Sequence, residues 1–102
     1  MSDMRESSKK TQYALRLHYL WLKLKQQTRD VSTVRAYLQM LLREATDLAL
    51  RATLKEALRS LDMYRNQKLL QSERMYAYRA AAAYVAAAYR LVNSTDFRER
   101  EL

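Results

Sequence analysis

The sequence predicts an all-α fold of three main helices, or four if the central one is divided, arranged as an elongated, self-associating bundle. Its 102 residues include neither glycine nor proline, although ordinary domains contain about 7% and 5% of them. Without glycine, few positions can take the positive φ angles that tight turns need. Leu, Ala, Arg and Gln, which favour helices over strands, are common, and isoleucine is absent. This composition therefore predicts long helices joined by few connecting segments.

The first predicted helix spans residues 8–29 and follows a polar arm at 1–7. One apolar row has helical spacing: Tyr13, Leu17, Leu20, Trp21 and Leu24. A second, adjacent row widens the face that we expect to be buried: Leu15, Tyr19 and Leu22. The charged residues of this helix are six cations, and Lys9, Arg16 and Lys23 repeat every seven residues along its outer side. Such a helix needs an apolar surface on one side and an acceptor of positive charge on the other.

The central predicted helix covers residues 31–65, and Asp30 or Ser32 is available as its N-cap. Its apolar row repeats at steps of four and three: Val34, Leu38, Leu41, Ala45, Leu48 and Ala52. We expect this row to face the core.

After Ala52 the apolar row changes side, which leaves two alternatives for the central helix. In the first, Thr53 and Glu56 form a capping box, and a separate helix starts near residues 52–53. In the second, Thr53 lies inside one continuous helix. Four polar residues, 65–68, then end the helix, and Asn66 among them tolerates the left-handed conformation.

The last predicted helix, residues 69–92, is rich in alanine and tyrosine and is followed by a charged tail at 93–102. Alanine has the highest helix propensity, and its small side chain lets another helix approach closely. Three helices of unequal length would leave apolar surface exposed in a monomer, so we expect self-association here. The expected contact residues repeat at steps of four and three: Tyr78, Ala82, Val85, Tyr89 and Val92.

Charge is unevenly distributed along the chain. Lys and Arg number 19 against 11 Asp and Glu, a net charge of +8. The excess lies in residues 8–29 and 64–92, whereas 30–63 are balanced. This pattern favours a polyanion, and nucleic acid (duplex DNA before RNA) is preferred to an anionic membrane surface. The residues expected to contact nucleic acid are Lys9, Lys10, Arg16, Lys23, Lys25, Arg29, Arg74 and Arg79.

The composition argues against an enzyme, a cofactor and a metal site. The chain contains no cysteine, and His18 is its single histidine, so thiolate sites and histidine pairs are excluded. The first ten residues lack the apolar stretch of a secretory signal. The longest apolar tract, residues 80–89, is half of the ~20 residues that a membrane-spanning helix needs. A virion or intracellular location is expected.

In its wholly helical, basic, glycine-free and proline-free character, the chain resembles the small coat proteins of filamentous archaeal viruses, which wrap double-stranded DNA. The resemblance implies a capsid role in a homomeric or heteromeric filament, and no motif transfers a role to a particular residue. We therefore expect a nucleic-acid-binding architectural or coat protein. The alternative is a small helical adaptor or inhibitor, of phage or plasmid type, that docks on a host protein.

Overall fold

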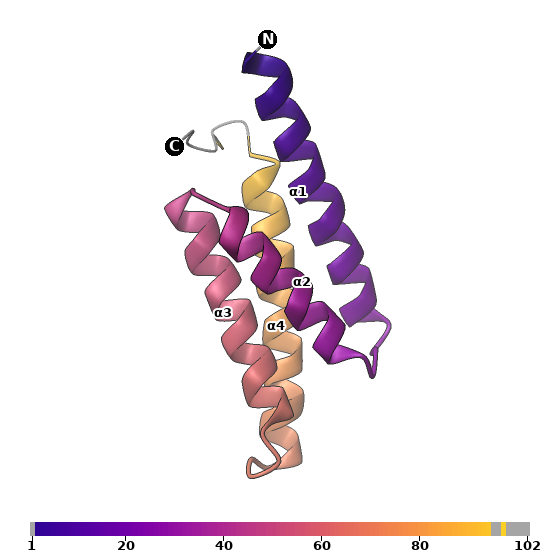
Figure 1. Cartoon of the computed structure of the whole chain (residues 1–102). Coiled ribbons are helices and arrows are strands. Elements are labelled where there is room, and N and C mark those ends of the chain that lie inside the picture. Colours follow the sequence, from indigo (N-terminus) through magenta and orange to yellow (C-terminus); the bar gives the residue numbers. More distant parts are fainter. Residues whose placement is uncertain (1, 95–96, 98–102) are drawn as a thin grey trace.

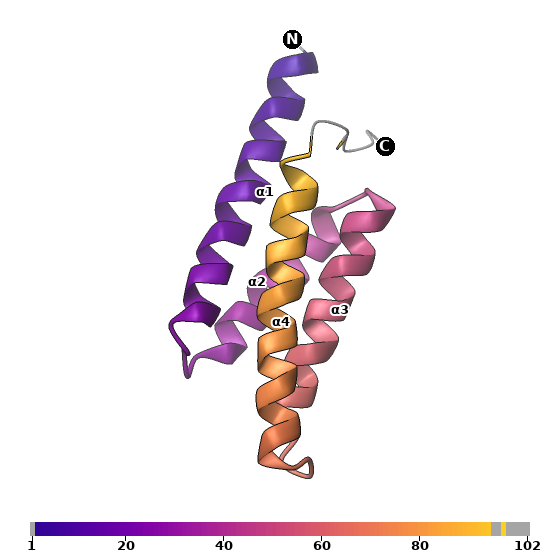
Figure 2. The same ribbon diagram turned by 180° about the vertical axis from the view of Figure 1, so that it is seen from behind.

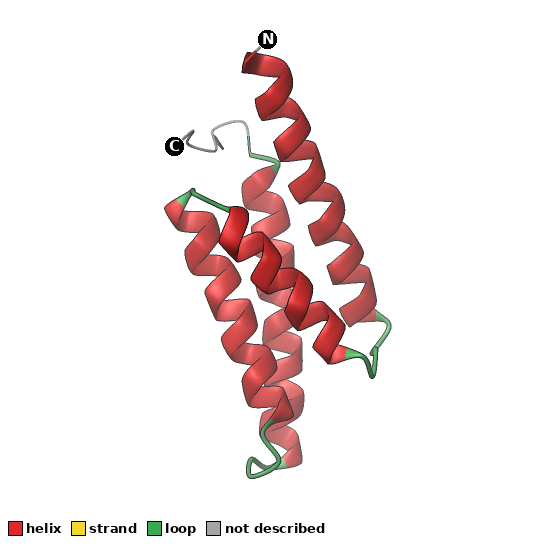
Figure 3. Cartoon of the chain, in the orientation of Figure 1, coloured by secondary structure: helices red, strands yellow, loops and turns green. Residues whose placement is uncertain are grey.

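The computed structural model describes residues 2–94 and 97, and it describes side chains from Lys9 onward. Within these residues the chain forms four helices and no strand (Figure 3). They are α1 (Ser2–Lys25), α2 (Val31–Glu44), α3 (Leu48–Arg65) and α4 (Gln71–Val92). The all-α prediction is confirmed, with four helices in place of three. None of these helices combines the length and the apolar character needed to cross a membrane.

Successive helices run in opposite directions, and α4 returns alongside α1 (Figure 1). Seen from behind, α4 lies between α1 and α3 and packs against both (Figure 2). On the opposite side, α2 crosses obliquely and contacts α1 and α3. The molecule is long and narrow, with extents of 51 × 23 × 20 Å. One flank of α1 therefore faces α2, and the other faces α4.

The core confirms one of the two apolar rows predicted for α1. The side chains of that row that reach the core are at most 1% exposed: Tyr13, Leu17, Leu20 and Leu24. The second row was wrongly expected to be buried, because Leu15, Tyr19 and Leu22 are 65%, 46% and 40% exposed. Only α2 and α4 pack against α1, so the side of α1 that faces away from them has no helix to cover it.

The ends of α1 differ from the prediction at both boundaries. The expected polar arm is helical from Ser2, and Met1 lies outside the described residues. At the other end the helix stops at Lys25, four residues before Arg29. Nothing in residues 2–7 breaks a helix, and adding a turn to an existing helix is easier than nucleating one.

A Schellman motif ends α1. The Thr28 N–H donates to the Lys23 carbonyl at 3.4 Å, and the Gln27 N–H donates to the Leu24 carbonyl at 3.0 Å. Gln27 has a φ of 54°, a left-handed position that is normally given to glycine. For a residue with a Cβ this conformation costs roughly 1–2 kcal/mol. The sequence predicted a turn from Thr28 onward but not the earlier end of the helix at Lys25, because the chain contains no glycine to mark the left-handed position.

The central helix is divided, and the predicted position of the break was wrong. The break lies at residues 45–47, where Ala45 ends α2 and Asp47 caps α3 by accepting the Leu50 N–H at 2.9 Å. Thr53 lies inside α3, and its hydroxyl donates to the Ala49 carbonyl at 2.9 Å. The predicted apolar row therefore loses phase at the break, and Leu48 beyond it is 74% exposed.

Three other helix boundaries lie at capping residues. Asp30 caps α2 as predicted, accepting the Thr33 N–H at 3.3 Å and the Thr33 hydroxyl at 2.7 Å. The Thr33 hydroxyl and backbone bonds, followed by the charge of Lys23, lower the pKa of Asp30. Asn66 ends α3 as predicted, although its φ of −78° is not left-handed. At the start of α4, the Glu73 carboxylate accepts the Leu70 N–H at 3.2 Å.

The apolar row of α4 packs inside the single chain. Tyr78, Val85 and Val92 are 7%, 0% and 0% exposed, so their expected role in self-association is corrected: they contact the chain's own core. Ala82 and Tyr89 are partly exposed, and self-association through them remains a prediction. Most of the predicted charged tail lies outside the described residues, but Phe97 is 8% exposed and joins the core.

Candidate nucleic-acid interface

The cations of α1 divide between its two flanks. Arg16 lies on the flank toward α2, where its guanidinium is 3.0 Å from the Glu44 carboxylate. Lys23 lies on the same flank, with its ammonium 5.7 Å from the centre of the Tyr19 ring, and its charge acts on Asp30. Carboxylates of α2 and of the turn before it therefore face this flank. Lys9 is exposed, and the seven-residue spacing places it in line with Arg16 and Lys23.

The flank of α1 toward α4 carries Lys10 and Lys25. The Lys10 ammonium donates to the Ser94 carbonyl, a neutral acceptor, at 3.1 Å. The Lys25 ammonium lies 5.6 Å from the centre of the Trp21 ring. The sequence contains no Asp or Glu at residues 7–29 or 74–94. The α4 flank therefore combines cations from two stretches of helix, residues 9–25 of α1 and 74–92 of α4, that contain no acidic residue.

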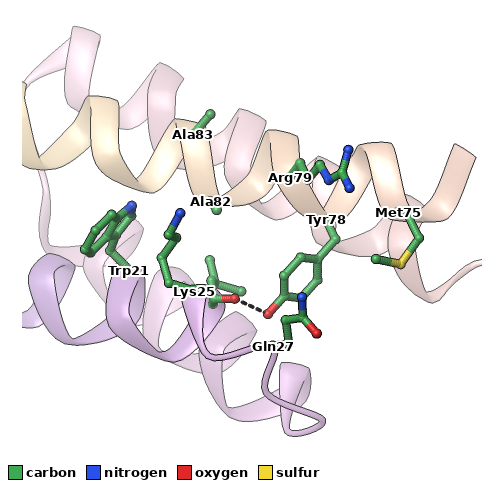
Figure 4. Close-up of a pocket in the computed structure, with 9 residues that line it drawn as sticks. Trp21, Lys25, Gln27, Met75, Tyr78, Arg79, Ala82 and Ala83 are labelled. Carbon is green, nitrogen blue, oxygen red and sulfur yellow. Dashed lines mark hydrogen bonds between the residues drawn. The ribbon is translucent and has the colours of Figure 1, made fainter. Parts of the chain in front are cut away.

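A cleft of about 370 Å³ opens between the C-terminal half of α1 and the N-terminal half of α4, and Trp21, Lys25 and Arg79 help to line it. Figure 4 shows Trp21 and Lys25 rising from α1 toward α4, whereas Tyr78 reaches from α4 toward the end of α1. Ala82 and Ala83 form part of the α4 side. Because these two side chains are small, they leave room between the helices.

A second cleft, of about 220 Å³, is lined in part by Arg29 and Tyr64. It shares Gln27, Met75 and Tyr78 with the first cleft, so the two clefts are neighbours at the end of α1. Their three exposed cations, Lys25, Arg29 and Arg79, are called the basic cluster below. No Asp or Glu is among the described residues that line either cleft.

Tyr78 fixes the two helices at this site. Its hydroxyl donates to the Leu24 carbonyl, which joins α4 to the last turn of α1 (Figure 4). Its ring packs edge-on against Tyr64, with centroids 5.0 Å apart. Burial, and then the neighbouring Tyr64, raise the pKa of Tyr78 above its usual 10.0. The hydroxyl therefore stays protonated at neutral pH and keeps the cleft walls together.

A third cleft, of about 440 Å³, lies further along the same boundary between α1 and α4. Lys10, His18, Tyr89 and Asn93 help to line it. The His18 ring is 5.7 Å from the Tyr89 ring and 6.3 Å from the Trp21 ring, centre to centre. The aromatic side chains therefore form a connection between the third cleft and the first.

The guanidinium groups of two predicted residues, Arg74 and Arg16, bind other groups of the protein. Arg74 donates from Nε to the Tyr64 carbonyl at 2.7 Å, and its guanidinium lies 5.5 Å from the Tyr64 ring centre. Arg74 therefore provides a hydrogen-bond donor for a carbonyl in the last turn of α3. Arg16 pairs with Glu44, as described above. Of the eight predicted residues, the structure places Lys25, Arg29 and Arg79 at two neighbouring clefts. Lys10 lies at the third cleft.

Sequence reasoning missed the aromatic residues at this face. Trp21 was expected in the core row, yet it is only partly buried and lines a cleft. His18 had no predicted role. The signal was present as a third row on α1, at steps of four, four, three and four: Lys10, Ala14, His18, Trp21 and Lys25.

No metal-binding group of three or more His, Cys, Asp or Glu side chains occurs in the described part of the chain. The face between α1 and α4 instead offers ammonium and guanidinium groups, aromatic rings and side-chain amides, which bind anions and stack on flat groups. No protein-family model, no curated protein and no solved structure matches this chain.

Proposed function

We propose that this protein is a non-enzymatic nucleic-acid-binding protein and that the face formed by α1 and α4 contacts the phosphate backbone. The observation that carries this proposal is the basic cluster: three exposed cations border two neighbouring clefts, and no carboxylate lies among the described lining residues. Arg and Lys bind phosphate oxygens and release condensed counterions, which gives affinity that does not depend on sequence. Lys10 extends the positive surface along α1.

An architectural or coat role needs contacts between copies of the chain as well. The buried residues of the α4 row are occupied in the core, so the proposed contacts use exposed apolar side chains elsewhere. Candidates on α1 and α2 are Tyr19, Leu22, Tyr37 and Met40. Copies joined through these residues would leave the face between α1 and α4 open to nucleic acid.

An adaptor or inhibitor that docks on another protein is the second candidate. The same exposed apolar residues favour it, because an apolar row on a helix is a common recognition surface. The two candidates differ in assembly. A coat protein forms high-mass particles with duplex DNA, whereas an adaptor remains a discrete species by light scattering.

The basic cluster can be tested with the triple substitution Lys25→Gln, Arg29→Gln and Arg79→Gln. Binding to labelled duplex and single-stranded oligonucleotides is measured by fluorescence anisotropy over a range of salt concentrations. Each phosphate contact contributes about 0.7–0.9 to the slope of log K against log salt. We expect the triple variant to lose about 2–3 from that slope and to bind at least about tenfold more weakly at low salt.

The matched control is Arg43→Gln, Lys55→Gln and Arg59→Gln, which removes the same three charges from exposed positions on α2 and α3. We expect this control to bind nearly as the unmodified protein does. Equal weakening in the two variants would assign the binding to net charge and remove the face between α1 and α4 from the proposal. An unmodified protein that binds no nucleic acid at low salt would favour the adaptor.

A further inference from the structure

Four side chains form a continuous row along the boundary between α1 and α4. The Tyr89 and His18 rings are 5.7 Å apart, and the His18 and Trp21 rings are 6.3 Å apart with planes inclined by 24°. The Lys25 ammonium lies over Trp21, 5.6 Å from the ring centre. A site that bound phosphate by charge alone would not need three aromatic rings in the same row as the cations.

The clefts at the two ends of this row contain the same kinds of groups. The 440 Å³ cleft has the cation Lys10, the ring of Tyr89 and the amide of Asn93. The 370 Å³ cleft has Lys25 and Arg79, the ring of Trp21 and the amide of Gln27. A cation binds a phosphate, a ring stacks on a base, and an amide can meet the polar edge of a base. Both volumes fall within the range of ordinary small-ligand pockets, about 300–1,000 Å³.

The row also has the length that a strand of several nucleotides would need. Lys10 and Lys25 are fifteen residues apart in one helix, which corresponds to about 22 Å along its axis. Ala82 and Ala83 on α4 have small side chains and keep the α4 side of the 370 Å³ cleft low. A flexible chain can therefore lie along the groove and place flat groups at both ends.

We propose that the groove between α1 and α4 binds single-stranded nucleic acid, with bases stacked on the Trp21, His18 and Tyr89 rings and phosphates held by Lys10, Lys25 and Arg79. The proposal rests on the nucleic-acid-binding function above and specifies the form of the ligand. Bases within a duplex are already stacked and paired, so they cannot enter the clefts. A single strand presents its bases for stacking on aromatic side chains, whatever their sequence.

The test compares three labelled ligands of about 20 nucleotides: an oligothymidylate, a strand of abasic residues with the same phosphates, and a duplex. Anisotropy at one low salt concentration gives the three affinities. We expect the oligothymidylate to bind at least about tenfold more tightly than the abasic strand, because stacking contributes about that factor for each base. Trp21 is the single tryptophan of the chain, so its fluorescence reports directly on the site. Oligothymidylate should quench it, and the abasic strand should not.

Two variants assign the stacking to residues. His18→Ala and Tyr89→Leu are expected to reduce oligothymidylate binding about tenfold, toward the abasic value, and to leave binding of the abasic strand unchanged. Tyr84→Leu is the control, since Tyr84 is an exposed aromatic residue on α4 that is not among the described residues lining the three clefts. Circular dichroism checks that each variant stays helical, and the tryptophan signal of the unmodified protein tests the proposal even if a variant does not fold.

Each outcome separates the two proposals. Equal affinities for the oligothymidylate and the abasic strand, without quenching, would overturn base stacking and leave the phosphate-binding function in place. A duplex that binds as tightly as the oligothymidylate would overturn the preference for a single strand. Absence of binding to all three ligands would overturn both proposals.

Discussion

The two flanks of α1 carry similar cations and meet different neighbours. Toward α2, Arg16 is 3.0 Å from the Glu44 carboxylate, and Lys23 acts on Asp30. Toward α4, Lys25 lies over Trp21 and shares a cleft with Arg79, and no acidic residue lines that cleft among the described residues. The charge of a helix therefore does not by itself define a binding surface. The helix packed beside it decides which cations remain available to a ligand.

The comparison depends on the rotation of α1 about its own axis, and the first prediction tests that rotation. Leu20 is 0% exposed and Leu22 is 40% exposed. We expect Leu20→Ala to lower the free energy of unfolding by about 3 kcal/mol, through lost burial and a residual cavity. Leu22→Ala in the same helix should lower it by less than about 1 kcal/mol. Urea unfolding of the two variants measures both values, and similar losses would mean that α1 is turned differently.

The second prediction concerns the bond that joins α1 to α4. The pKa of Tyr78 is raised in the folded protein, so its contribution to stability is complete below the unfolded value of about 10 and is lost as pH rises through the folded value. Tyr78→Phe should lower the free energy of unfolding by about 1 kcal/mol at neutral pH. It should also flatten the decline above pH ~10. Urea unfolding at a series of pH values measures both effects, and an unchanged alkaline decline would show that Tyr78 does not cause it.

The third prediction concerns a substitution that makes the flank of α1 toward α2 resemble the flank toward α4. Glu44→Gln frees Arg16, and we expect a severalfold gain in nucleic-acid affinity at low salt, with a salt slope larger by about 0.9. Stability should fall by less than about 1 kcal/mol, because the ion pair is largely exposed. Asp62→Asn makes the same charge change and frees Arg35, which lies 2.7 Å from Asp62 and bridges α2 and α3. Equal gains in nucleic-acid affinity in the two variants would show that the position of the freed arginine does not matter. That result would contradict the distinction drawn between the two flanks of α1.

The local features of the fold could be predicted from the sequence. The helical class follows from composition, the Asp30 cap from a carboxylate before a run of helical residues, and the core row of α1 from spacing alone. Each of these depends on residues that are close together along the chain. The break at residues 45–47 was missed because Ala45 continued the apolar row and because Asp47 suited a helical ion pair as well as a cap.

Features that depend on long-range packing could not be predicted. The pairing of Arg16 with Glu44 joins residues 28 positions apart, and it exists only because α2 folds back beside α1. The apolar row of α4 suggested contact with another copy, since the sequence did not show that α1 and α3 cover it. The basic cluster combines residues from α1, the following turn and α4, so its cations could be named from the sequence, but their proximity could not.

The left-handed Gln27 has a consequence for how the protein meets a ligand. A chain without glycine has few positions where the backbone dihedral angles can change at low energetic cost. Turns among its described residues are also held by specific side-chain and backbone hydrogen bonds, as at Asp30, Asp47 and Gln27. We expect the four helices to keep their relative orientation when nucleic acid binds. The nucleic acid, and not the protein, would then change shape on binding, so flexible nucleic acids should bind more tightly than stiff ones.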